Sequence, residues 1–168
     1  MILFPEIMII KINPEIIPYR RKIQALCKVP YYGHSRGCPN YAKKEGCPPG
    51  QLLINKVLDF KKDIFVIYTV FCVGEFAERM GKKHPDWNDR QNYNPRYWQP
   101  TARKFHRMEE NKALEETGIE KIINSPEAHG VDLTGLMKEI GIRLKWDWPP
   151  EHKRTNKVYI ISLGGYSL

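Results

Sequence analysis

Four segments rich in β-branched and aromatic residues predict the strands of a sheet. Residues 64–73 are almost uninterrupted in apolar character, which is typical of a central strand buried on both faces. The isoleucine-rich residues 4–12 predict a first strand, with Pro5 at its start or at a sheet edge. Residues 143–148 and 157–163 predict two closing strands on either side of a proline-containing turn.

Apolar residues at helical spacing predict helices at three places, of which two are short. The first short helix follows the Pro-Pro-Gly sequence at 48–50 and covers the apolar positions of residues 53–60. The other begins at the N-cap residue Asp132 and stops at Gly141. Its inward-facing residues are Leu133, Leu136, Met137 and Ile140.

The middle of the chain predicts a long loop and then a long helix. Residues 81–100 are polar and aromatic without a clear period, and a loop of this length is usually functional or mobile. The helix begins at Asn94-Pro95 or at Pro100-Thr101 and runs to about Thr117-Gly118. Its inward side is expected to carry Trp98, Ala102, Phe105 and Met108.

Strands that alternate with helices predict an α/β or α+β fold, with a mixed sheet and a metal-binding loop packed at one end. At 168 residues the chain is long enough for one hydrophobic core and too short for two comfortable ones. We therefore expect a single domain over residues 1–168.

The net charge of +8 is compatible with binding to an anionic partner such as nucleic acid. Its basic residues are scattered in pairs, which is also typical of a well-solvated surface. The strongest nucleic-acid candidate is the predicted loop at 81–100, where aromatic residues alternate with arginines and bases could stack over a cationic groove.

The N-terminal segment has no basic region before its apolar residues and no small-residue cleavage site, so no signal peptide is predicted. No later stretch approaches the roughly 20 apolar residues of a membrane helix. The expected location is the cytoplasm. In that reducing compartment, clustered cysteines are more often metal ligands or redox groups than disulfides.

Three of the four cysteines lie in one proline- and glycine-rich segment, residues 27–50, which begins at Cys27. Cys38 and Cys47 are each preceded by glycine and followed by proline, so a flexible residue stands before the sulfur and a fixed φ after it. Iron-sulfur ferredoxin sequences use a Cys-Pro pair in the same way. Residues 27–50 are therefore predicted to form a metal-binding loop.

The cysteine spacing favours a [4Fe-4S] cluster over zinc. Structural zinc sites are usually built from Cys-x(2–4)-Cys pairs, because each such turn places two sulfurs on one ion. The gaps here are ten, eight and twenty-four residues, so no such pair exists. A cluster is larger than a single ion and can be reached from widely spaced turns. Zinc is the alternative cofactor.

Cys72 has two interpretations. As the fourth ligand it would complete the set Cys27, Cys38, Cys47 and Cys72. As the end of an apolar strand it would be a small buried hydrophobe, and three thiolates would then leave one iron open to a substrate sulfur or oxygen. His34 and His129 are alternative ligands, since imidazole can replace a thiolate; His34 is the better of the two because it lies within the loop.

Several short motifs follow one another along the chain: Cys27, Gly37-Cys38-Pro39-Asn-Tyr41-Ala-Lys43, Cys47-Pro48-Pro49, the sequence Ser-Pro-Glu-Ala-His-Gly-Val-Asp-Leu at 125–133, and Gly141. In these motifs the chain resembles an uncharacterised family of cysteine-rich proteins described as predicted metal-binding. In that family a Cys, Cys-x-x-Tyr-x-Lys and Cys-Pro-Pro block precedes a strand, and a Glu-Ala-x-Gly-Ile-Asp-Val segment lies toward the C-terminus. The resemblance implies a metal at the first three cysteines. The family has no settled activity.

The chain departs from this family in one respect. Members carry a second cysteine-rich block just before the Glu-Ala-x-Gly segment, whereas residues 102–117 here form a charged predicted helix without cysteine. The resemblance therefore implies one centre and puts a two-cluster electron relay in doubt.

Two functions follow from these observations, and they leave open whether the protein is an enzyme. The first is a metal-binding protein that holds one [4Fe-4S] cluster for redox or sulfur chemistry, on a nucleic acid or another anionic substrate. The second is a zinc-stabilised module without catalytic activity, whose basic loop binds RNA or DNA. A third, in which oxidised cysteines staple an exported domain, is disfavoured by the lack of a predicted signal peptide.

Overall fold

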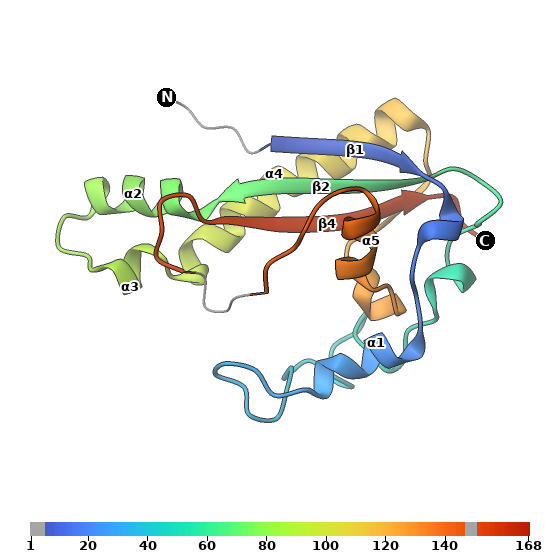
Figure 1. Ribbon diagram of the computed structural model, residues 1–168, viewed down its shortest axis with the longest axis horizontal. Coiled ribbons are helices and arrows are strands. Elements are labelled where there is room, and N and C mark those ends of the chain that lie inside the picture. The colour runs from blue at the N-terminus through green and yellow to red at the C-terminus, as the bar shows by residue number, and fades with distance from the viewer. Residues whose placement is uncertain (1–5, 147–150) are drawn as a thin grey trace.

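The computed structural model describes residues 6–146 and 151–168, and its centre is a four-stranded antiparallel sheet (Figure 1). The strand order is β1-β2-β4-β3. The strands are β1 (Glu6–Ile12), β2 (Ile64–Cys72), β4 (Lys157–Gly165) and β3 (Lys121–Ile123). The fold is α+β, within the predicted class, but the pairings are all antiparallel and not mixed. Residues 4 and 5 of the predicted first strand lie outside the described residues.

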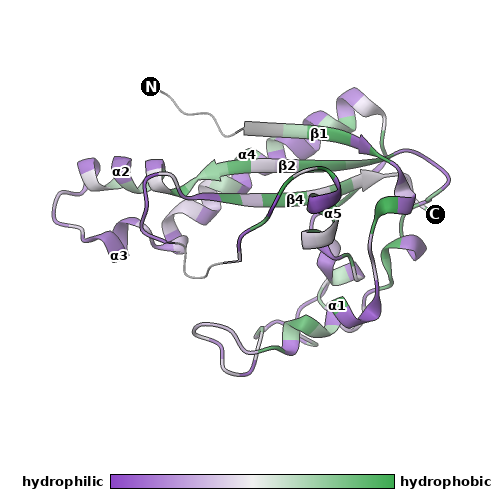
Figure 2. Cartoon of the chain, viewed as in Figure 1, coloured by the Kyte–Doolittle hydropathy of each residue, from purple (hydrophilic) through white to green (hydrophobic). Residues whose placement is uncertain are grey.

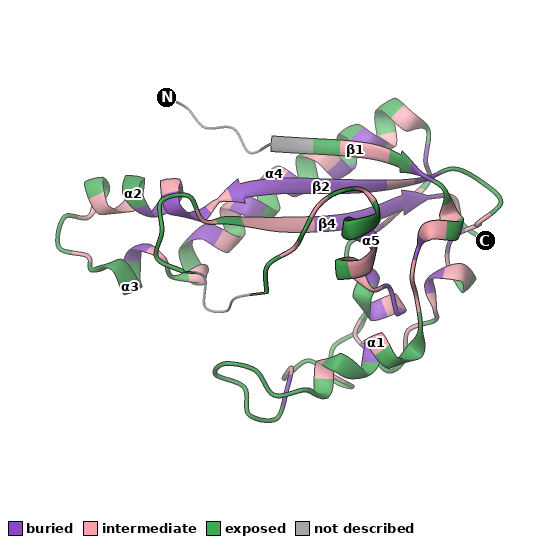
Figure 3. Cartoon of the chain, viewed as in Figure 1, coloured by how far each residue is buried: buried purple, intermediate pink, exposed green. Residues whose placement is uncertain are grey.

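Strand β2 is the predicted central strand, and its place between β1 and β4 confirms that prediction. It pairs with β1 up to Ile12↔Ile64 and with β4 from Phe65↔Gly164 to Cys72↔Lys157. Every residue of β2 except Phe65 and Cys72 is buried (Figure 3). Most of the strand is apolar (green in Figure 2) with a paler stretch in its middle, because both faces of this strand are covered by other elements.

Two layers cover the sheet. The long helix α4 (Pro95–Thr117) crosses one face and packs on β2 and β4. The short helix α5 (Leu133–Glu139) and the segments after β1 cover the other face, where Leu136 and Met137 join the main core. Side chains alternate along a strand, so Ile67 contributes to the α4 side and Val66 to the α5 side.

Helix α4 confirms the predicted long helix. The Asn94 side chain caps it by accepting a 3.0 Å hydrogen bond from the N–H of Arg96, the earlier of the two predicted starts. It ends at Gly118, whose φ of 72° is left-handed. As predicted, its inward side includes Trp98 and Ala102, with Phe105 partly buried beside them.

The buried stripe of α4 differs from the prediction in its second half. Met108 is 58% exposed. The buried positions after Ala102 are His106, Glu110 and Ala113, which continue a spacing of about one turn. Two ionisable side chains therefore lie between α4 and the sheet, where apolar residues were expected.

The predicted long loop at 81–100 is wrong over most of its length. Helix α2 (Val73–Lys83) continues directly from β2, and α3 (Asp89–Asn92) follows before α4 begins. Helix α3 starts with a capping box: the Asn88 side chain accepts from the Gln91 N–H, and the Gln91 side chain accepts from the Asn88 N–H, both at 3.0 Å. Most polar residues in this segment are helix caps or lie on exposed helix faces, whereas Asn92 is buried.

The predicted helix at 53–60 is reduced to the 3-10 turn η3 (Ile54–Lys56). Ile54 and Leu58 are both fully buried, which accounts for their helical spacing in the sequence. The chain leaves the helical path at Leu58, because this residue forms an isolated β-bridge with Ser167 near the C-terminus.

The C-terminal predictions are mixed. Helix α5 is confirmed: the Asp132 side chain accepts from the Gly135 N–H at 3.1 Å, and Gly141 has a φ of 86°. Strand β4 is confirmed, whereas residues 143–146 are in no strand and residues 147 and 148 lie outside the described residues. Strand β3, which was not predicted, pairs with β4 only from Lys121↔Gly165 to Ile123↔Leu163.

Candidate metal centre and adjoining cleft

The cysteine-rich loop begins where α1 (Arg21–Ala25) passes into η2 (Leu26–Lys28), which contains Cys27. The backbone N–H of Cys38 donates a 2.7 Å hydrogen bond to the carbonyl oxygen of Cys27, so the chain returns to its starting point. Gly37 permits this approach: its φ is 78°, and a Cβ atom there would lie 2.5 Å from the Cys27 oxygen. The glycine before Cys38 is therefore required by close packing.

Cys47 lies in a second turn of the same loop. Its N–H donates to the carbonyl oxygen of Lys44 at 3.1 Å, and the N–H of Ala42 donates to the carbonyl oxygen of Pro48 at 2.8 Å. Pro48 is buried, and the Pro48-Pro49 bond is cis. These contacts fold residues 38–48 into a compact turn.

The three thiols of the loop act on one another electrostatically. Burial raises the pKa of the Cys27 thiol, and the nearby Cys38, Glu127 and Cys47 raise it further. Cys38, Cys47 and the Glu127 carboxyl therefore all lie within electrostatic range of the Cys27 thiol. Burial also raises the pKa of Glu127, although part of this residue's surface is exposed.

The 3-10 turn η4 (Pro126–His129) packs, from far along the sequence, against α1 and residues 51–53, the two segments that flank this loop. The Gln24 side chain, 95% buried, donates to the carbonyl oxygens of Gln51 and Ala128 at 2.9 and 2.8 Å and so joins the two segments. Gly130 follows the turn, and a Cβ atom there would lie 2.6 Å from a methyl carbon of Leu53. Tertiary contacts thus hold the Glu-Ala-His-Gly sequence beside the two ends of the cysteine loop.

His129 has a defined orientation on this turn. Its Nδ1 lies 2.8 Å from the carbonyl oxygen of Leu52. Because a carbonyl oxygen only accepts, Nδ1 carries the proton, and Nε2 of the neutral ring keeps its lone pair. A backbone carbonyl bonded to one ring nitrogen is the usual arrangement behind a metal-binding histidine.

His34, the other alternative ligand, lies at the tip of the loop. It forms an isolated bridge with Tyr31, and the two rings are 4.7 Å apart. His34 and Cys38 both line a small surface hollow of about 420 Å³. The structure therefore keeps His34 near one thiol, on the exposed side of the loop.

Cys72 is separate from the other cysteines. It ends β2 and caps α2, whereas Cys27 lies beyond α1 in a different part of the molecule (Figure 1). Its thiol donates to the carbonyl oxygen of Arg154 at 3.4 Å. The expected set of four cysteines is therefore not brought together in this structure.

The side chains of the loop and of η4 fit a metal centre in their chemistry. The three thiols of the loop and the imidazole of His129 are soft and borderline ligands suited to iron-sulfur clusters or zinc, and the Glu127 carboxyl is a harder ligand that zinc also accepts. Among residues 6–146 and 151–168, no three His, Cys, Asp or Glu side chains are close enough to hold a single metal ion.

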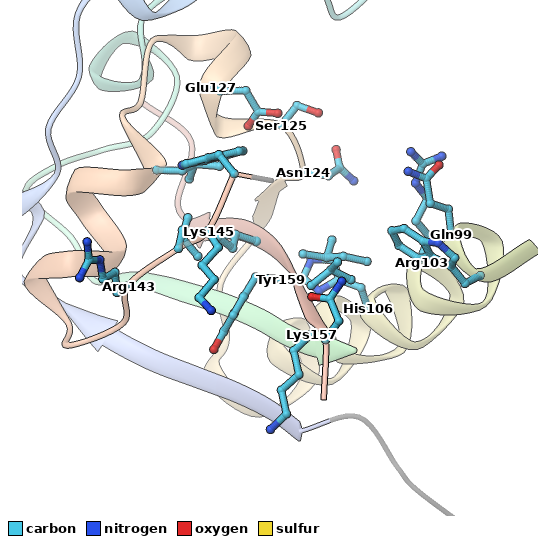
Figure 4. A pocket seen from close by; sticks show the side chains of 18 of the residues that line it. Gln99, Arg103, His106, Asn124, Ser125, Glu127, Arg143, Lys145, Lys157 and Tyr159 are labelled. Carbon is cyan, nitrogen blue, oxygen red and sulfur yellow. The ribbon is translucent and has the colours of Figure 1, made fainter. Parts of the chain in front are cut away.

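A cleft of about 980 Å³ adjoins this centre and runs along the outer edge of β4. Gln99 and Arg103 on α4 form one side, and Arg143 and Lys145 form the other (Figure 4). Glu127 lines the cleft as well as neighbouring Cys27, and Lys44 from the cysteine loop also lines it. The cleft and the cysteine loop therefore share a boundary.

A buried polar network lies beneath the α4 side of the cleft. The Ser162 hydroxyl donates to Glu110 Oε1 at 2.5 Å, so His106 Nε2, 2.7 Å from the same hydroxyl oxygen, is the donor to Ser162. Thr69 lies 2.9 Å from His106 Nδ1. This geometry differs from a catalytic triad, because both ring nitrogens of His106 are engaged and Ser162 is fully buried.

The hydrogen bonds of this network favour the ionised form of Glu110. Burial raises the pKa of its carboxyl, but hydrogen bonds from His106, Ser162 and Asn124 together lower it below the ordinary value. Sequence reasoning missed the network, although a signal was present: His106 and Glu110 stand four residues apart in phase with Trp98 and Ala102. Polar residues on the apolar stripe of a helix indicate buried hydrogen bonds.

Among the described residues, none of the helices is long and apolar enough to span a membrane. No protein-family model, curated protein or solved structure matches the chain.

Proposed function

We propose that the protein binds one metal centre, a [4Fe-4S] cluster, through Cys27, Cys38 and Cys47, and uses it for redox or sulfur chemistry. The observation that carries this proposal is the 2.7 Å hydrogen bond from the backbone N–H of Cys38 to the carbonyl oxygen of Cys27, with Cys47 in the next turn of the same loop. The effect of Cys38 and Cys47 on the pKa of Cys27 agrees with this arrangement.

The fourth ligand under this proposal is His129 and not Cys72. His129 follows Glu127 on the turn that packs beside the two ends of the loop, and its Nδ1–H is bonded to Leu52. Its Nε2 is therefore available to a metal, with the carbonyl group holding the ring in place. Imidazole ligation of iron-sulfur clusters has precedent in Rieske centres.

A cluster is preferred over a single zinc ion for a geometric reason. One ion requires all its ligands within bonding distance of a single point, and among the described residues no three suitable side chains meet this requirement. A cluster presents several irons and accepts thiols that lie further apart. The spacing of the cysteines in the sequence supports the same choice.

The neighbouring cleft supports chemistry on an anionic substrate. Arginine and lysine side chains line it, and Glu127 lies at the boundary between the cleft and Cys27. A bound cluster would supply electrons or an iron coordination position to a molecule in the cleft. The protein's own residues would bind and orient that molecule.

The test is a measurement of iron, acid-labile sulfide and zinc per chain, with a visible absorption spectrum, on protein purified without oxygen. We expect about four irons with matching sulfide and broad visible absorption. One zinc per chain with no sulfide would reject the cluster and support the zinc-stabilised module described below. Chains free of iron and zinc after anaerobic reconstitution would reject both.

The alternative is a zinc-stabilised nucleic-acid-binding module without catalytic activity. The observation that favours it is the number of cationic side chains around the cleft, together with the exposed Trp146 at its edge. A colourless protein with one zinc whose affinity for single-stranded DNA or RNA falls steeply with salt would support this function.

A further inference from the structure

The cleft beside β4 carries an excess of positive charge that the described carboxylates do not neutralise. Arg103 and Arg107 project from α4, Arg143 lies on the opposite side, and Lys157 lies on β4. Within the described residues, no carboxylate makes an ion pair with any of these four. Glu110 is already engaged by His106, Ser162 and Asn124. The unpaired cations can therefore bind an anion, and arginine is well matched to phosphate oxygens.

An exposed aromatic ring stands at the same cleft. Trp146 is 69% exposed, yet its indole N–H donates a 2.7 Å hydrogen bond to the hydroxyl of Thr134 on α5. The ring is thus held in place with much of its surface open to solvent. An immobilised indole next to cations is suited to stacking against a planar heterocycle.

The floor of the cleft offers further hydrogen-bonding groups. Strand β3 pairs only with the last residues of β4. In the described part of the chain, no strand therefore pairs with residues 157–162 of β4 on this side. The edge of β4 therefore presents backbone N–H and C=O groups. Asn124 and Ser125, where the chain leaves β3, and Gln99 on α4 add polar side chains.

We propose that this cleft binds a nucleotide unit, with its phosphates at Arg103, Arg107 and Lys157 and its base against Trp146. The shared chemistry of phosphate and heterocycle can come from a free nucleotide or from one residue of a single-stranded nucleic acid. A volume of about 980 Å³ lies at the upper end of ordinary small-molecule sites and accommodates a nucleotide. The proposal is independent of the metal, because these residues lie outside the cysteine loop.

The experiment compares three probes by titration calorimetry at low salt: ADP, inorganic pyrophosphate and a short oligothymidylate. The main variant is Arg103→Glu combined with Arg107→Glu, and the control is Lys104→Glu, an exposed residue of the same helix that does not line the cleft. Circular dichroism and thermal melting establish that each variant is folded. Lys157→Ala, at an exposed position of β4, is the second variant if the double variant does not fold.

We expect ADP to bind, with an affinity at least about tenfold lower in the double variant and nearly unchanged in Lys104→Glu. Trp146→Ala should weaken ADP by about tenfold and leave pyrophosphate unaffected, since only ADP carries a base. If oligothymidylate binds more tightly than ADP, with a steep salt dependence, the bound nucleotide belongs to a single-stranded nucleic acid. If ADP binds more tightly, the ligand is a free nucleotide. No binding of ADP or oligothymidylate, or equal affinities in the double variant and in Lys104→Glu, would overturn the proposal.

Discussion

The backbone N–H of Cys38 donates a 2.7 Å hydrogen bond to the carbonyl oxygen of Cys27. This contact joins the start of the cysteine loop to its first Gly-Cys-Pro turn and brings the backbones of the two cysteines together without a metal. The loop is therefore folded by its own backbone, and a metal would bind to a site that is already partly formed.

The glycine between these cysteines provides the first prediction. Gly37→Ala should sharply reduce metal retention, because the new Cβ would lie 2.5 Å from the Cys27 carbonyl oxygen and force the two segments apart. Gly33→Ala is the matched control: Gly33 has the same φ of 78°, but beyond its chain neighbours no atom lies within 4 Å of the position that a Cβ would take. Both variants bear the left-handed backbone cost of about 1–2 kcal/mol.

Iron per chain and the melting temperature should be measured for both glycine variants. Equal iron content in Gly37→Ala and Gly33→Ala would contradict the requirement for close approach at Gly37.

Replacement of the cysteines separates the loop from Cys72. Cys47→Ala should lose the metal, since it removes one of the three thiols of the loop. Cys72→Ala should retain it, because the Cys72 thiol contacts Arg154 and lies apart from the loop. Metal analysis of the two purified variants gives the answer, and loss of iron in Cys72→Ala would restore Cys72 to the ligand set.

The histidine on η4 is tested by removal and by rescue. His129→Ala should lower metal affinity by about 10–100-fold or more, and His129→Cys should recover much of it, since a thiolate can take the place of imidazole. His34→Ala should have a smaller effect, because His34 lies at the exposed tip of the loop. Chelator competition measures all three variants. If His129→Ala binds as tightly as the unchanged protein, His129 is not the fourth ligand.

The buried network predicts a pH-dependent stability. The pKa of Glu110 in the folded protein is below its ordinary value, so the ionised form favours folding. This contribution is fully present above the ordinary pKa of a glutamate and is lost as the pH falls toward the lower pKa of the folded state. Glu110→Gln should destabilise the protein at neutral pH by about 1–3 kcal/mol and flatten the acid side of the stability profile.

Urea unfolding at several pH values measures this effect. Glu109→Gln is the control, since Glu109 is adjacent on α4 but is not part of the network. An identical pH profile for the two variants would contradict the role assigned to Glu110.

Several elements could be predicted because their signals are local. The unbroken apolar run of β2 required burial on both faces, and Asp132 and Gly141 marked the two ends of α5. The failure at residues 81–100 has a physical cause. Only residues 81–83 of α2 and the four residues of α3 lie in this segment, too few to show an apolar period, and the capping residues resemble those of a loop.

The candidate site was predictable only in part. The turns around Cys38 and Cys47 depend on adjacent glycines and prolines, which the sequence displays directly. The position of His129 depends on contacts such as Gln24 with Ala128, which are 104 residues apart, and no local pattern reveals them. The cleft depends on how far β3 extends along β4, which only the pairing register determines.

The sequence by itself thus determined the central strand, the long helix, the cap of α5 and the three-cysteine loop, because each follows from the chemistry of neighbouring residues. The tertiary structure decided which distant segments meet: η4 beside Cys27, Cys72 apart from it, and His106 and Glu110 under the cleft. The physical reason is that strand order and the packing of helices on a sheet depend on the burial of the whole core. Backbone preferences within a few residues specify neither the strand order nor the helix packing.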